Sequence, residues 1–259
     1  MYVYRCEDTQ ESIFTAIYNV YEEHRQREEV RLEITDEPLL FAEDIFVETD
    51  YAKAGRVAET IIRRFGRQDC HSISYALAAD NPDKAQAVYR VIMMGLKENV
   101  RHGHLLDNLA DDNVRLVFSL AGYTGREYDH LRGFMRFEEL ENGALYARFA
   151  PRSNLLPFLM GHFADRLPAE NFVIYDEKRK CMGVHKAGCI QWYLMMCDEN
   201  TGEPIEHNRL KLSEGEEEYS ELFKWFCEKI AVRERRSLSL QRKMLPLRFR
   251  GYMTEFGNN

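Results

Sequence analysis

Apolar positions change their spacing near residue 133, and this change divides the chain into two patterns. From residue 51 to 132 they recur every three or four positions, which is typical of helices packed along one face. From 134 to 197, short segments alternate apolar and polar positions, which is typical of strands. The pattern predicts an α+β fold, with a mostly helical N-terminal half packed on an antiparallel sheet or meander, followed by a C-terminal helix.

The first 50 residues predict two short strands around a helix. Alternation predicts strands at Tyr2 to Arg5 and at Val30 to Thr35. Thr9 or Ser12 is expected to cap a helix that continues to Glu28. The acidic segment 36–50, which contains a proline, is expected to form a loop or short irregular structure. The later helices are predicted at Tyr51 to Gly66, Cys70 to Ala79, Asn81 to about Val100, and Asn113 to Leu131.

The segment 134–150 predicts a β-hairpin. Asn142-Gly143 tolerates the positive φ that hairpin turns need. The loop is either these two residues or the three residues 141–143. The three-residue loop is favoured because it places charged and apolar side chains on opposite faces of the hairpin. It pairs Leu140 with Ala144 and places Arg136 opposite Arg148. The other face then gathers apolar side chains only: Met135, Phe137, Leu145, Ala147 and Phe149.

The remaining elements complete the predicted architecture. A helix is expected from Asn154 to Leu167 and another from Tyr219 to Ile230. Between them, segments 172–175, 181–185 and 189–197 predict an antiparallel meander. We interpret residues 1–259 as one domain, with two lobes, 1–132 and 133–259, as the alternative.

Charge is unevenly distributed along this acidic chain, whose net charge is −8. Segment 198–221 holds nine acidic residues against two basic ones, a net charge of −7. Segment 229–250 holds eight basic residues against one acidic residue, a net charge of +7. The basic segment could bind a polyanion, or the two segments could neutralise each other. No apolar run reaches the length of a membrane span, and the first residues do not resemble a secretion signal, so a cytoplasmic location is expected.

Several familiar chemistries lack their motifs in this sequence. We find no phosphate-binding or dinucleotide-binding glycine loop, no nucleophile elbow, and no zinc deaminase signature. The six cysteines form no C-x-x-C pair, and His102-Gly103-His104 has no diagnostic metal-ligand partner. Neither a metal nor a cofactor is therefore expected.

The candidate functional residues are arginines, histidines and carboxylates near the hairpin. Arginine suits bidentate contact with phosphate, and nearby aromatic rings suit unstacked bases. The candidate nucleic-acid-binding residues are Arg132, Arg136, Arg148, Arg166, Arg179, Arg248 and Arg250. The candidate acid–base residues are His130, His162, Glu127 and Glu138. We expect Arg132, Arg136 and Arg148 to form one concave site near both histidines. Structural ion pairs and core aromatics are the alternative.

Five blocks of sequence also carry a family resemblance. They are G-F-M-R-F-E at 133–138, F-A-P at 149–151, H-F-A-D-R at 162–166, I-Y-D-E-K-R at 174–179 and L-P-L-R-F-R-G-Y-M-T-E-F at 245–256. In these blocks the chain resembles a bacterial family associated with DNA metabolism and repair, typically encoded beside a DNA modification/repair radical SAM protein. A related domain occurs fused to a uracil-DNA-glycosylase-like domain. The family has no established reaction.

Three hypotheses for function follow. The resemblance implies an accessory module that binds DNA, single-stranded or damaged, and works with a radical SAM partner. The second is an enzyme acting on a nucleotide or damaged base through the histidines and carboxylates. The third is a protein–protein scaffold that uses the apolar helix 219–230.

Overall fold

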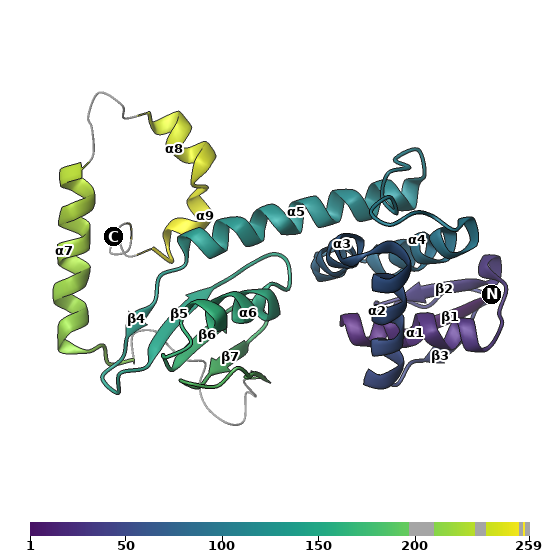
Figure 1. Cartoon of the computed structure of the whole chain (residues 1–259), viewed down its shortest axis with the longest axis horizontal. Helices are drawn as coiled ribbons and strands as arrows, with labels where there is room; N and C mark the ends of the chain where they lie inside the picture. The colour runs from purple at the N-terminus through teal and green to yellow at the C-terminus, as the bar shows by residue number, and fades with distance from the viewer. Residues whose placement is uncertain (197–209, 231–236, 254–255, 257–259) are drawn as a thin grey trace. The chain divides into compact units, whose positions relative to one another are not determined.

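The computed structural model describes residues 1–196, 210–230, 237–253 and 256 (Figure 1). The chain forms two compact units, unit 1 (Met1–Arg126) and unit 2 (Glu127–Asn259). Their boundary falls within the helix α5 (Asp112–Phe134). Each unit contains helices and a sheet, so the α+β class is confirmed. The choice between one domain and two lobes stays a prediction.

Unit 1 contains a three-stranded parallel sheet that the sequence did not predict. Strand β1 (Tyr2–Arg5) lies between β2 (Val30–Glu33) and β3 (Glu43–Phe46), and both neighbours run parallel to it. The expected loop at 36–50 was wrong over β3. The helices of unit 1 are α1 (Gln10–Glu22), α2 (Tyr51–Phe65), α3 (Arg67–Ala78), α4 (Lys84–Glu98) and the first part of α5.

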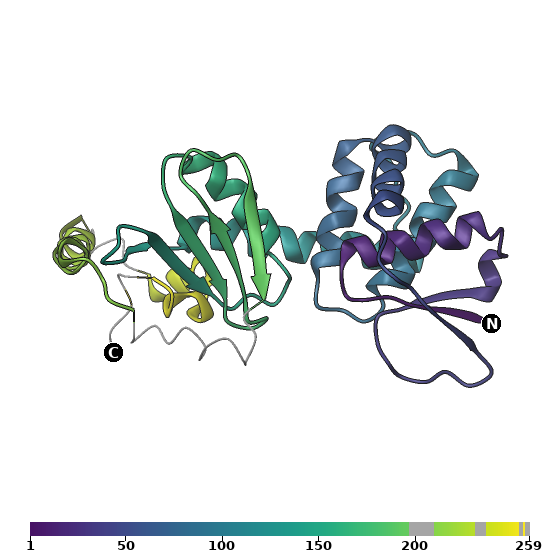
Figure 2. The same ribbon diagram turned by 90° about the horizontal axis from the view of Figure 1, so that it is seen from below.

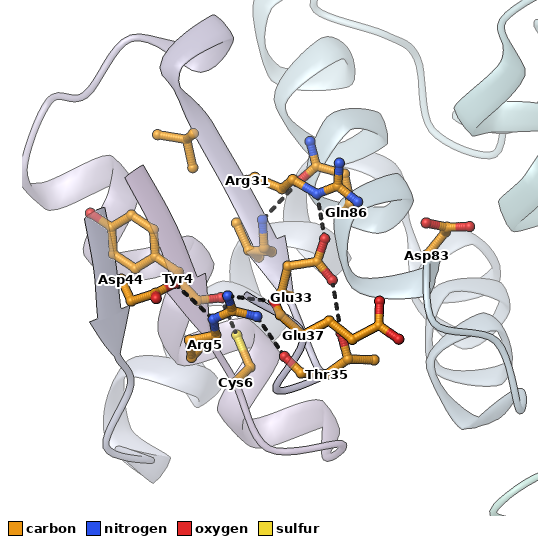
Figure 3. A network of polar contacts seen from close by, with 12 residues as sticks. Tyr4, Arg5, Cys6, Arg31, Glu33, Thr35, Glu37, Asp44, Asp83 and Gln86 are labelled. Atoms are coloured by element: carbon orange, nitrogen blue, oxygen red, sulfur yellow. Dashed lines mark hydrogen bonds and ion pairs between the residues drawn. The ribbon is translucent and has the colours of Figure 1, made fainter. Parts of the chain in front are cut away.

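Strand β3 escaped prediction because most of its side chains are exposed and its sequence shows no apolar alternation. A buried guanidinium holds this region instead. Arg5, only 8% exposed, donates to Asp44 Oδ1 at 2.8 Å and to the carbonyl oxygens of Thr35 and Glu37 at 2.6 and 2.8 Å (Figure 3). One charged side chain on β1 therefore binds both β3 and the segment that follows β2.

The helices of unit 1 begin and end where local chemistry requires. Thr9 caps α1 by accepting from the Ser12 N–H, and Asp50 caps α2 by accepting from two N–H groups. Gly66 ends α2 with a φ of +97°, which a glycine adopts without strain. A Cβ at Gly95 would lie 2.4 Å from the Leu105 side chain, so α4 can pack this closely only with a glycine there.

The five-stranded sheet of unit 2 is mixed rather than wholly antiparallel. Its strands β4 to β8 follow their order in the chain: Glu138–Glu139, Leu145–Phe149, Phe172–Asp176, Cys181–His185 and Trp192–Met196. β6, β7 and β8 form the predicted antiparallel meander, but β5 and β6 are parallel. The helix α6 (Leu156–Arg166) connects β5 to β6, and a strand–helix–strand connection is the usual route to a parallel pair.

Helix α6 packs against the sheet of unit 2 (Figure 2). A Cβ at Gly183 would lie 2.3 Å from Met160 Sδ, so the glycine in β7 allows α6 to approach closely. Residues from α5, β5, α6, β6 and α9 fill this core, including Leu131, Phe149, Leu159, Phe172 and Phe249.

The hairpin has the predicted loop but a shorter first arm. The Leu140 N–H donates to Ala144 O at 2.9 Å, and Gly143 has a φ of +77°, so the three-residue loop is confirmed. Residues 134–137 are not in a strand, because α5 continues through Phe134. The Met135 N–H donates to Leu131 O at 2.8 Å, and both side chains are buried. Two buried side chains spaced four residues apart, as in a helix, therefore decide the structure here, rather than the apparent alternation of apolar and polar positions.

Three helices follow the sheet: α7 (Glu214–Ile230), α8 (Leu238–Met244) and α9 (Leu247–Arg250). The acidic segment thus lies partly within α7, and its residues 198–209 fall outside the described part. Residues 231–236 of the basic segment also lie outside it. Among the described helices, none is both long enough and apolar enough to cross a membrane.

Candidate functional site

The turn after β5 is held by a buried carboxylate. Glu127, only 5% exposed, accepts from the backbone N–H groups of Arg152 and Ser153 at 3.0 and 2.9 Å. The guanidinium of Arg248, on α9, lies 3.3 Å from the same carboxylate. Glu127 therefore connects α5, the 151–153 turn and the C-terminal segment.

The turn after β6 lies beside the first turn because β5 and β6 are parallel, with Phe149 opposite Asp176. Asp176 is completely buried and accepts from the backbone N–H groups of Lys178 and Arg179 at 3.0 and 3.1 Å. Its carboxylate also lies 3.0 Å from the Arg179 guanidinium. The free-energy cost of burying this charge is offset by the three donors that contact the carboxylate.

Cationic side chains of the second turn reach back to the first. Arg179 donates to the carbonyl oxygen of Arg152 at 2.6 Å, and the Lys178 ammonium donates to the same oxygen at 3.2 Å. The side chain of Arg152 is itself exposed, whereas its backbone makes the contacts that hold the turn. The arrangement leaves the Arg152 guanidinium available to an anion.

A third ion pair extends this group of charges. Arg148, on β5, lies 3.0 Å from Glu177, and the hydroxyl of Tyr252 donates to the same carboxylate at 3.1 Å. The Arg148 guanidinium is 5.6 Å from the Tyr252 ring centroid. Burial, followed by the charge of Glu177, raises the pKa of Tyr252 to about 12. The phenol therefore stays protonated and donates at neutral pH.

We call these residues the turn network. It contains the cations Arg148, Arg152, Lys178, Arg179 and Arg248 and the carboxylates Glu127, Asp176 and Glu177. Five cations against three carboxylates give it a net charge of +2. Two buried acids, Glu127 and Asp176, hold the side chains of Arg248 and Arg179, and the net positive charge lies at the turns. Arginine and lysine side chains gathered in this way suit contact with a phosphate group.

The structure brings only three of the seven predicted arginines into the turn network. Arg148, Arg179 and Arg248 belong to it, whereas the other four lie outside it. Arg132 lies 3.3 Å from Asp129 and packs over the Tyr128 ring. Arg166 is exposed at the end of α6.

The two remaining predicted arginines also lie apart from the network. Arg136 donates to the carbonyl oxygen of Gly133 at 3.0 Å and packs over the Phe223 ring. Arg250 packs over the Phe256 ring. Arg136 and Arg148 do not form the expected facing pair, because the ladder of the hairpin stops at Glu138, two residues after Arg136. The predicted convergence of Arg132, Arg136 and Arg148 is therefore replaced by three separate environments.

The two histidines lie among aromatic rings rather than beside the candidate carboxylates. His130 stacks on Phe134 with ring centroids 5.6 Å apart, and it also contacts Phe249. His162 contacts Phe163 and Tyr128. Burial lowers the pKa of His162, and the charges of Arg132 and Arg166 lower it further. A neutral imidazole is therefore favoured there at pH 7.

The candidate carboxylates have structural contacts in place of the predicted acid–base pairs. Glu127 binds the 152–153 turn and Arg248, although it lies three residues from His130 on α5. Glu138 begins β4, opposite Tyr146. Among the described residues there is no group of three metal-ligating side chains.

Sequence reasoning missed Arg152 and Lys178, which the turn network places beside each other. Their signal is local: Arg152 follows Pro151 at a strand end, and Lys178 lies in a run of five charged residues, 176–180. Only the parallel pairing of β5 and β6 brings the two turns together, and that pairing was not predicted.

Comparison with known proteins places this site within a recognised domain. A family model, DUF4130, described as a domain of unknown function, matches residues 82–255, which is more than half of the chain. The chain belongs to the DUF4130 family. The DUF4130 match contains the whole turn network, from Glu127 to Arg248, together with Tyr252. No curated protein and no solved structure matches the chain.

Proposed function

We propose that this DUF4130 protein is a DNA-associated binding module whose turn network contacts the phosphate backbone. The supporting observation is the exposed Arg152 side chain, on a turn whose backbone is held by the buried Glu127 carboxylate and contacted by the Lys178 ammonium. The resemblance noted in the sequence supports DNA as the polyanion. It also supports a radical SAM protein as the partner that would carry the chemistry.

The geometry fits a site that positions a phosphate chain. Arginine and lysine side chains contact phosphate oxygens, and each contact releases counterions from the nucleic acid. The Tyr252 ring, packed beside Arg148, adds an aromatic surface next to these cations. Because three acids neutralise part of the positive charge, we expect a moderate affinity for DNA that depends strongly on salt concentration.

The acid–base alternative has weaker support. A general base needs a carboxylate or a histidine free to take a proton within hydrogen-bond reach of the substrate. Glu127 instead accepts two backbone N–H groups and faces Arg248. His130 and His162 pack against aromatic rings. We therefore favour binding over catalysis by this chain.

Fluorescence polarisation with labelled single- and double-stranded oligonucleotides, at two salt concentrations, tests the proposal. Affinity should fall steeply as salt rises. The double variant Arg152→Ala/Lys178→Ala should bind more weakly and lower the salt slope by about two, since each lost phosphate contact lowers it by about one. The control Arg115→Ala/Arg126→Ala removes the same charge from unit 1 and should leave the slope unchanged.

Two outcomes would contradict this proposal. Equal weakening by both double variants would show that net charge, rather than the turn network, controls binding. The absence of binding to either oligonucleotide at low salt would remove DNA contact by the isolated chain. A partner-dependent version would then be tested by adding the radical SAM protein to the same titration.

A further inference from the structure

Unit 1 contains a hollow of about 570 Å³ between α1, α2 and α4. Its volume lies within the range of small-molecule pockets. Its floor is apolar and buried, and is formed by Ile17, Val57, Ile61, Phe65 and Ile92. These side chains also belong to the core of unit 1, so the floor is a rigid part of the fold.

The rim of the hollow is cationic and aromatic. Arg56, Arg63 and Arg64, all exposed on α2, line it together with Tyr18 and Tyr21 from α1. Among the residues that the structure describes, no acidic side chain lines the hollow. A pocket with an apolar floor and three positive charges on its rim is therefore present in a chain whose net charge is −8.

The contacts of the rim arginines are with neutral groups. Arg56 donates to the Tyr18 hydroxyl at 3.1 Å and packs over the same ring. Arg64 donates to the Asn99 side-chain oxygen at 2.6 Å. These bonds orient the guanidinium groups without neutralising them. Like charges on one rim repel, and an anion bound at the rim would lessen that repulsion.

We infer that this hollow binds a small organic anion with a hydrocarbon body. The body would lie on the apolar floor, and the carboxylate or phosphate would face Arg56 and Arg64. Bidentate guanidinium contact suits either group. This site lies in a different unit from the turn network, and its proposed ligand is of a different class. The inference is therefore independent of DNA binding.

A nucleotide fits the hollow less well than a hydrocarbon. The edge of a nucleobase needs polar partners, and burying it on an apolar floor leaves its donors and acceptors unsatisfied. Thr60 is a hydroxyl-bearing side chain of the lining, but its hydroxyl already donates to the Arg56 carbonyl oxygen at 2.8 Å. The chemistry of the floor therefore selects a hydrocarbon body.

Isothermal titration calorimetry of the full chain with laurate and with dodecyltrimethylammonium, both below their micelle concentrations, tests this inference. The two probes share a hydrocarbon tail and differ in the sign of the head group. Laurate should bind at least about tenfold more tightly, because hydrogen bonds to a charged group stabilise the complex by this order. Adenosine monophosphate should not compete with it.

Matched variants locate the binding. Arg56→Gln/Arg64→Gln should weaken laurate binding by about tenfold or more, whereas the control Arg115→Gln/Arg126→Gln should leave it unchanged. Met93→Trp, which fills the hollow, should abolish binding of the tail. The inference would be overturned by equal binding of both head groups, by no laurate binding, by unchanged laurate binding in Arg56→Gln/Arg64→Gln, or by displacement of laurate by the nucleotide.

Discussion

The turn network of unit 2 and the hollow of unit 1 use arginine in different ways. In unit 2, Arg148, Arg179 and Arg248 each face a carboxylate, and two of those carboxylates are buried. In unit 1, Arg56 and Arg64 donate to a phenol and an amide at the rim of an apolar hollow. The first group is largely neutralised by the fold itself, and the second retains its charge. Counting arginines along a sequence therefore does not separate structural cations from available ones.

Among the substitutions considered, removing Glu127, the central acid of the turn network, should lower the free energy of unfolding most. Glu127→Ala leaves two backbone N–H groups and the Arg248 guanidinium without their acceptor. We expect the free energy of unfolding to fall by about 3 kcal/mol. Urea unfolding followed by tryptophan fluorescence measures it, because Trp192 and Trp225 both lie in unit 2.

The control for Glu127→Ala is Asp165→Ala, which removes an exposed carboxylate from α6. It should change the free energy of unfolding by less than about 0.5 kcal/mol. If both variants lose the same stability, Glu127 does not hold the network as we describe.

A smaller loss in the free energy of unfolding is expected when the buried Asp176 loses its charge but keeps a side-chain oxygen. Asp176→Asn retains an acceptor for the N–H groups of Lys178 and Arg179 and weakens the contact with the Arg179 guanidinium. The loss should be about 2 kcal/mol. A double-mutant cycle with Arg179→Gln should give a coupling of about 1 kcal/mol. Additive losses would place Arg179 outside the network.

The Tyr252 hydroxyl gives the network a dependence on alkaline pH. Its pKa is raised from 10.0 to about 12, so the folded state favours the protonated phenol. The unfolded state loses that proton first as the pH rises, and stability therefore falls between pH 10 and about pH 12. Tyr252→Phe should cost about 1 kcal/mol at pH 7.

The alkaline loss of stability in Tyr252→Phe should be smaller than in the parent chain. It should not vanish, because the pKa of the buried Tyr146 is also raised. Urea titrations at pH 7, 9 and 11 measure both effects. An unchanged pH profile would mean that Tyr252 titrates normally.

The smallest effect should come from the rim of the hollow in unit 1. Without ligand, Arg56→Gln/Arg64→Gln should alter the midpoint of thermal unfolding by no more than a few degrees, because exposed arginines bound to neutral groups contribute little. Circular dichroism at 222 nm detects the helices of unit 1. A large loss would show that these arginines are structural, like those of unit 2.

The elements with strong local signals could be predicted from the sequence. The helix ends at Thr9, Asp50 and Gly66 follow capping chemistry, and the Asn142-Gly143 loop follows turn chemistry. β3 could not be predicted, because a buried guanidinium from β1 holds it. The end of α5 was misplaced because residues 134–138 fit both a strand and a helix until Leu131 and Met135 are seen to be buried together.

The candidate sites were harder to predict than the elements. Arg148, Arg179 and Arg248 were recognised by residue type, but their convergence depends on the parallel pairing of β5 and β6 and on the position of α9. The hollow in unit 1 has no motif at all. It arises from the packing of α1, α2 and α4. In the sequence, its arginines look the same as those on any solvent-exposed helix face.

The contact between Glu127 and Arg248 also has a kinetic consequence for unit 2. These residues are 121 positions apart, so the contact closes a loop that includes most of the unit. Closing so long a loop costs entropy before any contact within it is gained. A refolding chain should therefore fix the 152–153 turn late. In pulsed hydrogen exchange, the Arg152 and Ser153 amides should become protected after those of α6, and earlier protection would show that Glu127 orders the turn before Arg248 arrives.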